Sequence, residues 1–355
     1  MANRLSASDS PSARVAVAGS AVRRHVPVST AGGGEIRVAW LAEGAIHEAT
    51  GAAALGQLPG LIAAPDAAVW VDLASPSSAE VEEVGGLLGL HPLIVEDVLE
   101  GNQRPKIEQT DGLVHVVLFR LDYDDAVRAV EIDFVLGLGY LLTVHDRAWD
   151  PRSVHHLRGG PGEILAHGPD HLLWALCDDI VDAYFPFTDR LGDALDTVQD
   201  EVVEGIGPGV LERVFTLKRE LHEVRRTISP VREVFNQLTT RDSALIDDAE
   251  LVYFRDVYDH VIRLTDELDN YRELAAATLD VYLTQVNNSL SVIMKRLTGV
   301  TVILAGVGAL AGIFGMSEAA AALGGTEASG FWLVTAITVG LATLAAIVLR
   351  RIDWI

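Results

Sequence analysis

The stretch LTGVTVILAGVGALAGIF, Leu297 to Phe314, contains eighteen residues and no charged side chain. A helix needs about 20 apolar residues to cross the hydrocarbon core of a bilayer. A second uncharged run of nineteen residues, FWLVTAITVGLATLAAIVL, follows at Phe331 to Leu349. A buried helix of a soluble protein is the alternative, but two such runs so close together favour a transmembrane hairpin. We therefore predict transmembrane helices at 297–314 and 331–349, joined by an external loop at 315–330.

Positive charges flank this hairpin on one side only. Lys295 and Arg296 precede the first run, Arg350 and Arg351 follow the second, and the sixteen-residue loop between them has no Lys or Arg. Because positively charged flanks stay in the cytoplasm, both chain ends are expected there, including a short tail at 350–355. The chain is then a multi-pass protein of the cell membrane (plasma or inner membrane) and contacts the lipid bilayer.

Small residues dominate the first predicted span, which allows close helix packing. Two interpretations stay open: several copies of this helix surround a common axis, or the helix packs against the second span. Neither span contains an ionisable side chain, which argues against a proton relay in the membrane. The small residues are Gly299, Ala305, Gly306, Gly308, Ala309, Ala311 and Gly312.

The composition narrows the choice of partners. The 355 residues carry a net charge of -23, which repels nucleic acid and attracts cations. The single cysteine, Cys177, excludes a disulfide framework and a thiolate zinc cluster, so any metal must be bound by oxygen or histidine. No enzyme signature is present.

The segments before the hairpin predict a cytoplasmic part. Residues 1–35 have the composition of a disordered tail. Residues 36–165 alternate strand-like runs such as AVWVDL and LVHVVLFRL with helical segments, which predicts a small α/β domain. Residues 166–248 predict a helical hairpin, and residues 249–296 a stalk helix that continues into the first span, about 100 Å long in total.

Charged side chains mark the helical hairpin. Its first part carries an acidic stripe and its second part a basic one, so inter-helix ion pairs and a weak cation-gathering surface are both open. Asp178, Asp179 and Asp182 could bind a metal, but the acidic stripe explains them adequately. His155 and His156 are expected to be exposed in a loop.

Three stretches of the chain resemble the CorA family of divalent metal ion transporters. They are LGLHPLIVEDVLEGNQRPKIE at Leu88 to Glu108, LLWALCDDIVDAYFP at Leu172 to Pro186, and Arg255 to Val300 followed by AGIFGM. The resemblance covers nearly everything after residue 65. It implies an α+β cytoplasmic domain, a pair of willow helices at 166–248, a long stalk helix and two transmembrane helices, assembled as a homopentameric funnel.

The same resemblance implies passive transport of Mg²⁺, with Co²⁺ and Ni²⁺ also carried, and Mg²⁺ bound as a regulator. Partners are then four further copies of the chain, divalent cations and lipid. Two alternatives remain: a membrane-anchored metal sensor or scaffold that does not conduct, and a member of the zinc-transporting branch.

The signature at the external mouth departs from the family pattern. The family has Gly-Met-Asn, whereas this chain has Gly315, Met316 and Ser317. A ring of amide oxygens suits an ion that keeps its water shell, and the shorter serine side chain would make a wider and weaker ring. We therefore expect an altered ion selectivity or affinity.

The resemblance also assigns roles by position. Met294 and Leu297 are candidates for a hydrophobic collar that closes by dewetting, and Asp280 for a ring of carboxylates that concentrates cations. Asp97 and Asp256 correspond to regulatory magnesium ligands between subunits, although a surface or helix-capping role is the alternative. The expected pore-lining residues are Ser291, Met294, Leu297, Thr301, Ala305, Gly308 and Gly312.

Overall fold

The structure is a computed structural model of the 355-residue chain. It describes residues 23–25, 28, 33–64, 66–101, 104–110, 112–124, 126–205, 207–240, 243–314 and 327–351. The chain forms two compact units. The first contains residues 1–198 and 212–276, and the second contains residues 199–211 and 277–355.

The first unit is built on an eight-stranded sheet in the order β3-β2-β4-β8-β7-β6-β5, with β1 paired to β7 beside this path. Neighbouring strands are antiparallel except for the parallel pairs β4–β8 and β1–β7. The strands are β1 Arg23–His25, β2 Glu35–Ala42, β3 Ala45–Thr50, β4 Val69–Ala74, β5 Lys106–Thr110, β6 Leu113–Asp124, β7 Ala126–Gly137 and β8 Tyr140–His145.

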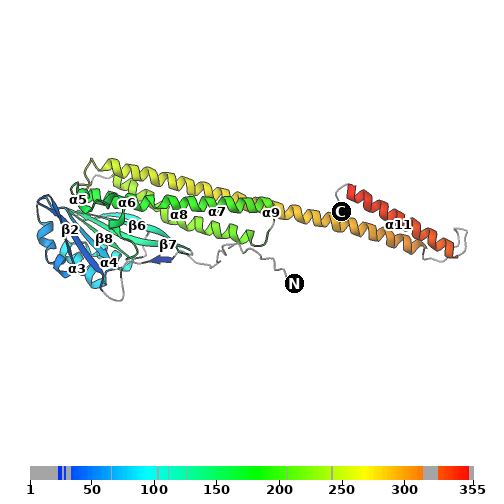
Figure 1. The fold of residues 1–355 in the computed structure, drawn as a ribbon, viewed down its shortest axis with the longest axis horizontal. Helices are drawn as coiled ribbons and strands as arrows, with labels where there is room; N and C mark the ends of the chain where they lie inside the picture. Colours follow the sequence, from blue (N-terminus) through cyan, green and yellow to red (C-terminus); the bar gives the residue numbers. More distant parts are fainter. Residues whose placement is uncertain are drawn as a thin grey trace, which may run out of the picture. The chain divides into compact units, whose positions relative to one another are not determined.

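Helices cover both faces of this sheet (Figure 1). Successive side chains of a strand point to opposite faces, so Val71 belongs to one hydrophobic core and Trp70 to the other. The first core includes residues of α1, α3 and α4, and the second includes residues of α6 to α9. The helices on the first face are α1 Ala52–Leu55, α2 Leu58–Ile62, α3 Ser78–Leu88 and α4 Pro92–Glu100.

Local sequence signals explain where α3 and α4, the two longer helices on this face, begin. Ser77 and Glu80 form a reciprocal capping box at α3: the Ser77 hydroxyl accepts from the Glu80 amide, and the Glu80 carboxylate accepts from the Ser77 amide at 2.7 Å. At α4, His91 Nδ1 accepts from the Leu93 amide at 3.2 Å and Pro92 occupies the first turn. The His91 cap defines where α4 begins, and α4 carries Asp97.

Longer helices cover the other face and form one hydrophobic seam. Apolar side chains of α9 pack into the same core as those of α6 and α8. Phe254, Val257, Val261 and Leu264 of α9 are fully buried there. One polar bond ties this layer to the sheet, because the buried Tyr184 hydroxyl donates to the Phe119 carbonyl. The elements are η1 Pro151–Ser153, η2 His155–Leu157, α5 Pro161–Leu165, α6 Pro169–Asp182, α7 Tyr184–Glu204, α8 Val210–Thr240 and α9 Leu251–Phe314.

Two findings refine the sequence predictions for this unit. Strand β1 lies inside the predicted tail 1–35, because the N-terminal half of β7 extends beyond β8 and leaves an edge open at Arg128 to Val130. On α8, Arg225 Nε donates to Asp269 Oδ1 on α9 at 2.5 Å. This bond lowers the pKa of the Asp269 carboxyl. The basic stripe of α8 thus pairs with the stalk helix at this point.

The second unit contains the end of α7, the start of α8, the C-terminal part of α9 and helix α11, Glu327–Arg351. Gln199 Nε2 donates to Thr278 Oγ1 at 3.2 Å, and Gln285 Nε2 donates to the Val203 carbonyl at 3.3 Å. These bonds tie the end of α7 to α9 within this unit.

Many large apolar side chains of α9 and α11 are exposed in this unit. Met294 and Leu297 are each 61% exposed and Leu304 is 65% exposed. Within the part of the chain that the structure describes, one helix segment, Leu251–Gly312, is long and apolar enough to span a membrane, and only 6% of its apolar window is buried. α11 contains the run 331–349 predicted as a second span. Such a continuous apolar surface requires a covering of lipid or of further copies.

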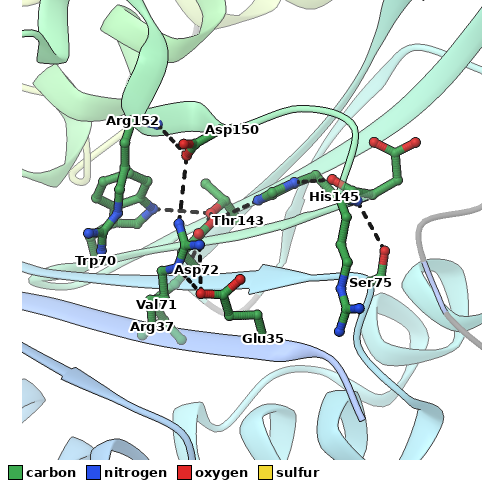
Figure 2. Close-up of polar contacts among 12 residues, drawn as sticks. Glu35, Arg37, Trp70, Val71, Asp72, Ser75, Thr143, His145, Asp150 and Arg152 are labelled. Atoms are coloured by element: carbon green, nitrogen blue, oxygen red, sulfur yellow. Dashed lines mark hydrogen bonds and ion pairs between the residues drawn. The ribbon is translucent and has the colours of Figure 1, made fainter. Parts of the chain in front are cut away.

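A buried polar cluster lies where the parallel strands β4 and β8 end (Figure 2). Asp72 Oδ1 accepts from the Thr143 hydroxyl at 2.6 Å and lies 2.9 Å from His145 Nε2. The Trp70 indole donates to the same hydroxyl at 3.1 Å. His145 Nδ1 lies 2.6 Å from the backbone oxygen of Asp146. Because a carbonyl oxygen only accepts, Nδ1 carries a proton, and the carboxylate at Nε2 favours a second one.

Burial opposes the charge on His145, but the hydrogen bond and charge of Asp72 outweigh it and raise the imidazole pKa. The stabilisation from this pair is therefore complete below the unfolded-state pKa of about 6.5 and is lost as pH rises through the higher folded-state pKa. The pair is a stability element that weakens under alkaline conditions.

The substitution His145→Leu tests this element. It leaves the Asp72 carboxylate buried without its imidazole, which should cost about 3–5 kcal/mol of unfolding free energy near neutral pH. The thermal midpoint of the purified wild-type protein should fall as pH rises from about 6.5, whereas the variant should show a flatter profile. Equal profiles in both proteins would contradict the assignment. The exposed His47, changed to Leu, provides the control.

Candidate ion pathway and candidate metal sites

The predicted pore residues lie along one stripe of α9. Ser291, Met294, Leu297, Thr301 and Ala305 recur every three or four positions, as residues on one helix face do. All of them are exposed in the single chain, as are Gly308 and Gly312. Asp280 lies about three turns before Ser291 and continues the same stripe. The structure therefore brings these predicted residues onto one uninterrupted helix surface.

Glycines in this helix leave open space around them. A Cβ atom added at Gly306, Gly308 or Gly312 would meet no atom within 4 Å. Packing within the described part of the chain therefore does not require glycine at these positions. Close approach of another helix would require it, and small residues serve that purpose in membranes.

Polar groups on the stripe are partly engaged by the helix itself. The Ser291 hydroxyl donates to the Asn287 carbonyl at 2.9 Å, and the Thr301 hydroxyl donates to the Leu297 carbonyl at 2.7 Å. Each hydroxyl oxygen retains lone pairs that face outward and can accept from the water shell of an ion. The signature residues Gly315, Met316 and Ser317 lie outside the described residues.

Asp97 is paired with a lysine. Lys106 Nζ contacts Asp97 Oδ2 and lies 3.0 Å from Glu108 Oε1. Burial disfavours the ammonium charge, but the hydrogen bonds to both carboxylates outweigh it and raise the Lys106 pKa. A positively charged ammonium group therefore already lies against Asp97, which the family resemblance assigns to a regulatory cation. Asp97, Glu108 and His115 each offer a ligand atom, all within 4.8 Å of one another.

Asp256 lies beside a second cluster. Its carboxylate is 72% exposed and lies 3.9 Å from His260 Nε2, one turn further along α9. His260 Nδ1 lies 3.3 Å from Asp182 Oδ1 on α6. Asp178, Asp182 and His260 bring three ligand atoms within 4.8 Å of one another. The acidic stripe proposed from sequence is therefore part of a candidate metal centre.

The sequence analysis did not predict that histidine side chains belong to this cluster. The i, i+4 spacing of Asp256 and His260 was the available signal, since it places both on one helix face. His156 was expected to be exposed, yet it is partly buried, with Nε2 at 2.9 Å from Asp178 Oδ2 and its ring against Trp174. That prediction was wrong because α6 packs against the loop.

Electrostatics of this cluster favour a cation. Burial and the neighbouring Asp178 carboxylate raise the pKa of Asp182, with His260 opposing the shift. Burial also raises the pKa of Asp179. Like charges held together out of water take up a proton more readily, and a divalent cation relieves the same repulsion. Carboxylate and imidazole ligands suit several divalent ions.

Asp97 and Asp256 lie on helices that cover opposite faces of the sheet. Ile94 of α4 belongs to one core and Phe254 of α9 to the other. The layer of strands separates the two helices (Figure 1).

A mixed α/β unit and a long helix with an exposed membrane-length segment place this chain among helical membrane proteins. The chain belongs to the family described as CorA-like Mg²⁺ transporter protein, whose model matches residues 65–351. This is a family of ion transporters rather than of enzymes.

Relatives and solved structures agree with this assignment. The chain is 34% identical over 255 residues to the cobalt/magnesium transport protein CorA of Thermotoga maritima, covering 70% of this chain and 72% of the relative. It is 24% identical over 295 residues to the zinc transport protein ZntB of Yersinia pseudotuberculosis, covering 80% and 86%. The complete CorA structure from Methanocaldococcus jannaschii matches with a TM-score of 0.73 at 23% identity, covering 90% and 98%. The last likeness confirms the predicted CorA-like fold.

The cluster beside Asp256 makes a prediction about protons. A divalent cation that binds Asp182 must displace its proton, which is held to a higher pH than usual. At about pH 5, above the ordinary Asp pKa of about 3.9, Mg²⁺ added to weakly buffered protein should release more protons from the wild type than from Asp182→Asn. The exposed Asp193, changed to Asn, should behave as wild type. Identical release from wild type and Asp182→Asn would refute a role for this carboxyl.

Proposed function

We propose that this chain assembles with four further copies into a funnel through which divalent cations, Mg²⁺ foremost, cross the membrane passively. The observation that carries this proposal is the α9 stripe from Asp280 to Gly312, which is continuous and exposed in the single chain. Five such helices around an axis would cover their glycine faces and enclose a path. Relatives named for cobalt, magnesium and zinc transport support divalent cations as cargo.

The α9 stripe has charged, apolar and polar parts, and each would interact with the ion in a different way. A ring of Asp280 carboxylates would raise the local concentration of cations at the cytoplasmic end. Met294 and Leu297 would form an apolar collar that empties of water when narrow and blocks a hydrated ion. Hydroxyls of Ser291 and Thr301, with the glycine positions, would pass the ion with its water shell, which Mg²⁺ gives up reluctantly. The residues Gly315, Met316 and Ser317 would select the ion at the external mouth.

Regulation would depend on the cytoplasmic carboxylates. Mg²⁺ held between Asp97 of one subunit and Asp256 of its neighbour would screen carboxylate repulsion in a chain of net charge -23. The Asp178–Asp182–His260 cluster beside Asp256 would add negative charge to the same region. Loss of these ions would let the subunits separate and open the path, so cytoplasmic Mg²⁺ would limit its own entry.

Ion flux into liposomes tests the transport proposal. Wild-type protein should admit Mg²⁺, and Ser317→Asn should lower the Mg²⁺ concentration for half-maximal flux about tenfold, because an amide adds hydrogen bonds worth about 0.5–1.5 kcal/mol each to the hydrated ion. The control is Ser289→Asn, an exposed serine on another face of α9.

Other outcomes of this assay identify the alternatives. Flux of Zn²⁺ in preference to Mg²⁺, Co²⁺ and Ni²⁺ would favour zinc transport, for which the ZntB relative is the supporting observation. Absence of any divalent flux with intact metal binding would replace the proposal by a sensor or scaffold that does not conduct.

Limited proteolysis tests the regulatory proposal. Mg²⁺ should protect the wild-type protein from cleavage, and the double variant Asp97→Asn with Asp256→Asn should lose most of this protection because both ends of the bridge are neutral. A matched double variant at the exposed Asp193 and Asp200 of α7 serves as the control. Unchanged protection in the first double variant would rule out these ligands.

A further inference from the structure

Strand register places three chemistry-bearing side chains on one sheet face. Glu108 of β5 lies directly opposite His115 of β6, and Lys106 lies opposite Val117. Alternation along the strands puts Lys106, Glu108 and His115 on the same face. This is the face covered by α4, which brings Asp97 to the same place.

His115 is fully buried, and only one of its two ring nitrogens has a hydrogen-bond partner within the described part of the chain. Its Nε2 lies 2.9 Å from Asp133 Oδ1, and both side chains are 0% exposed. Its Nδ1 is also buried and has no hydrogen-bond partner within the described part of the chain. A buried polar nitrogen without a partner is unfavourable, so this one calls for a ligand or an ion.

Asp133 gives His115 the form of a metal ligand. A carboxylate that accepts from Nε2 holds the proton there and leaves the lone pair on Nδ1. Metal-binding histidines commonly have such a carboxylate behind them, which fixes the ring and raises its basicity. Full protonation of His115 would instead leave an unpaired N–H in the interior.

The ligand atoms of the three side chains could bind one ion if they moved slightly closer together. Ligand atoms of Asp97, Glu108 and His115 lie within 4.8 Å of one another. Two ligands of one ion, each at about 2.1 Å, lie at most about 4.2 Å apart. Lys106 Nζ presently lies against both carboxylates and is a single-charge substitute for that ion.

We infer that Asp97, Glu108 and His115 form a site within one chain for a transition metal such as Co²⁺, Ni²⁺ or Zn²⁺, and that Lys106 closes this site until the metal displaces it. An imidazole ligand favours these ions over Mg²⁺, which prefers oxygen. The inference rests on the proposed transport function and adds to it. Binding here would withdraw Asp97 from the bridge between subunits, so a transition-metal cargo would be sensed separately from Mg²⁺.

Co²⁺ binding to the full-length protein in detergent tests the site. CoCl₂ is titrated in excess Mg²⁺, and visible absorption reports nitrogen ligation of bound Co²⁺. All proteins carry His260→Gln, which removes the histidine of the other cluster. His115→Gln should weaken Co²⁺ binding by about tenfold or more, with unchanged Mg²⁺ binding. Lys106→Met should tighten Co²⁺ binding by about tenfold, because a competing ammonium is lost.

A control variant and a second test variant distinguish loss of the metal site from a general effect of substitution. His47→Gln changes an exposed histidine on β3, at the opposite edge of the sheet, and should leave Co²⁺ binding as in the parent. If His115→Gln fails to fold, tightening in Lys106→Met supports the site and unchanged binding overturns it. If His115→Gln folds and binds Co²⁺ like the parent, His115 and Asp133 are only a structural pair.

Mg²⁺ flux in liposomes separates this test from that of the proposed function. Failure of the transport proposal appears as absence of divalent flux in the wild type. Failure of the present inference appears as normal Mg²⁺ flux together with Co²⁺ binding that is insensitive to His115 and Lys106.

Discussion

One helix belongs to both parts of this protein, and the burial of its first half is the constraint on which the rest depends. Phe254, Val257, Val261 and Leu264 of α9 are fully buried among α6 to α8. About thirty residues further along, the same hydrogen-bonded helix exposes Met294 and its apolar neighbours. Within the first unit, the rotation of α9 about its axis is therefore set by a hydrophobic seam, because turning this part of the helix would expose the seam to water.

Pairs of carboxylate and imidazole recur throughout the first unit. Asp72 with His145, Asp133 with His115, Asp178 with His156 and Asp182 with His260 each lie within 3.3 Å. A strongly acidic chain that folds must neutralise its buried carboxylates with protons, side-chain cations or metal ions. The three options compete for the same oxygens, and Lys106 at Asp97 is a clear instance. Such competition is the physical basis of the regulation by bound metal that we propose.

Local sequence signals predicted much of the fold. The β-branched strand runs, the helical segments between them and the uncharged run from Leu297 are all signals that act over a few residues, so they can be read without knowledge of distant contacts. The prediction of a disordered tail at 1–35 did not include strand β1. This strand pairs with the open edge of β7, a contact between residues far apart in the sequence. Exposure of His156 was mispredicted for a similar reason, since α6 lies over it.

The sequence by itself determined that the chain has a membrane-length apolar helix, an α+β unit before it and the spacing that puts the predicted pore residues on one helix face. Those properties follow from composition and helical or strand period, which are local. Only the tertiary structure decided which charged groups meet. His260 reaches Asp182 across 78 positions, and His115 faces Glu108 through the β5–β6 register with Asp97 brought in by α4. Hydrophobic packing and strand register, which no single segment encodes, select those neighbours and so bring together the candidate metal ligands.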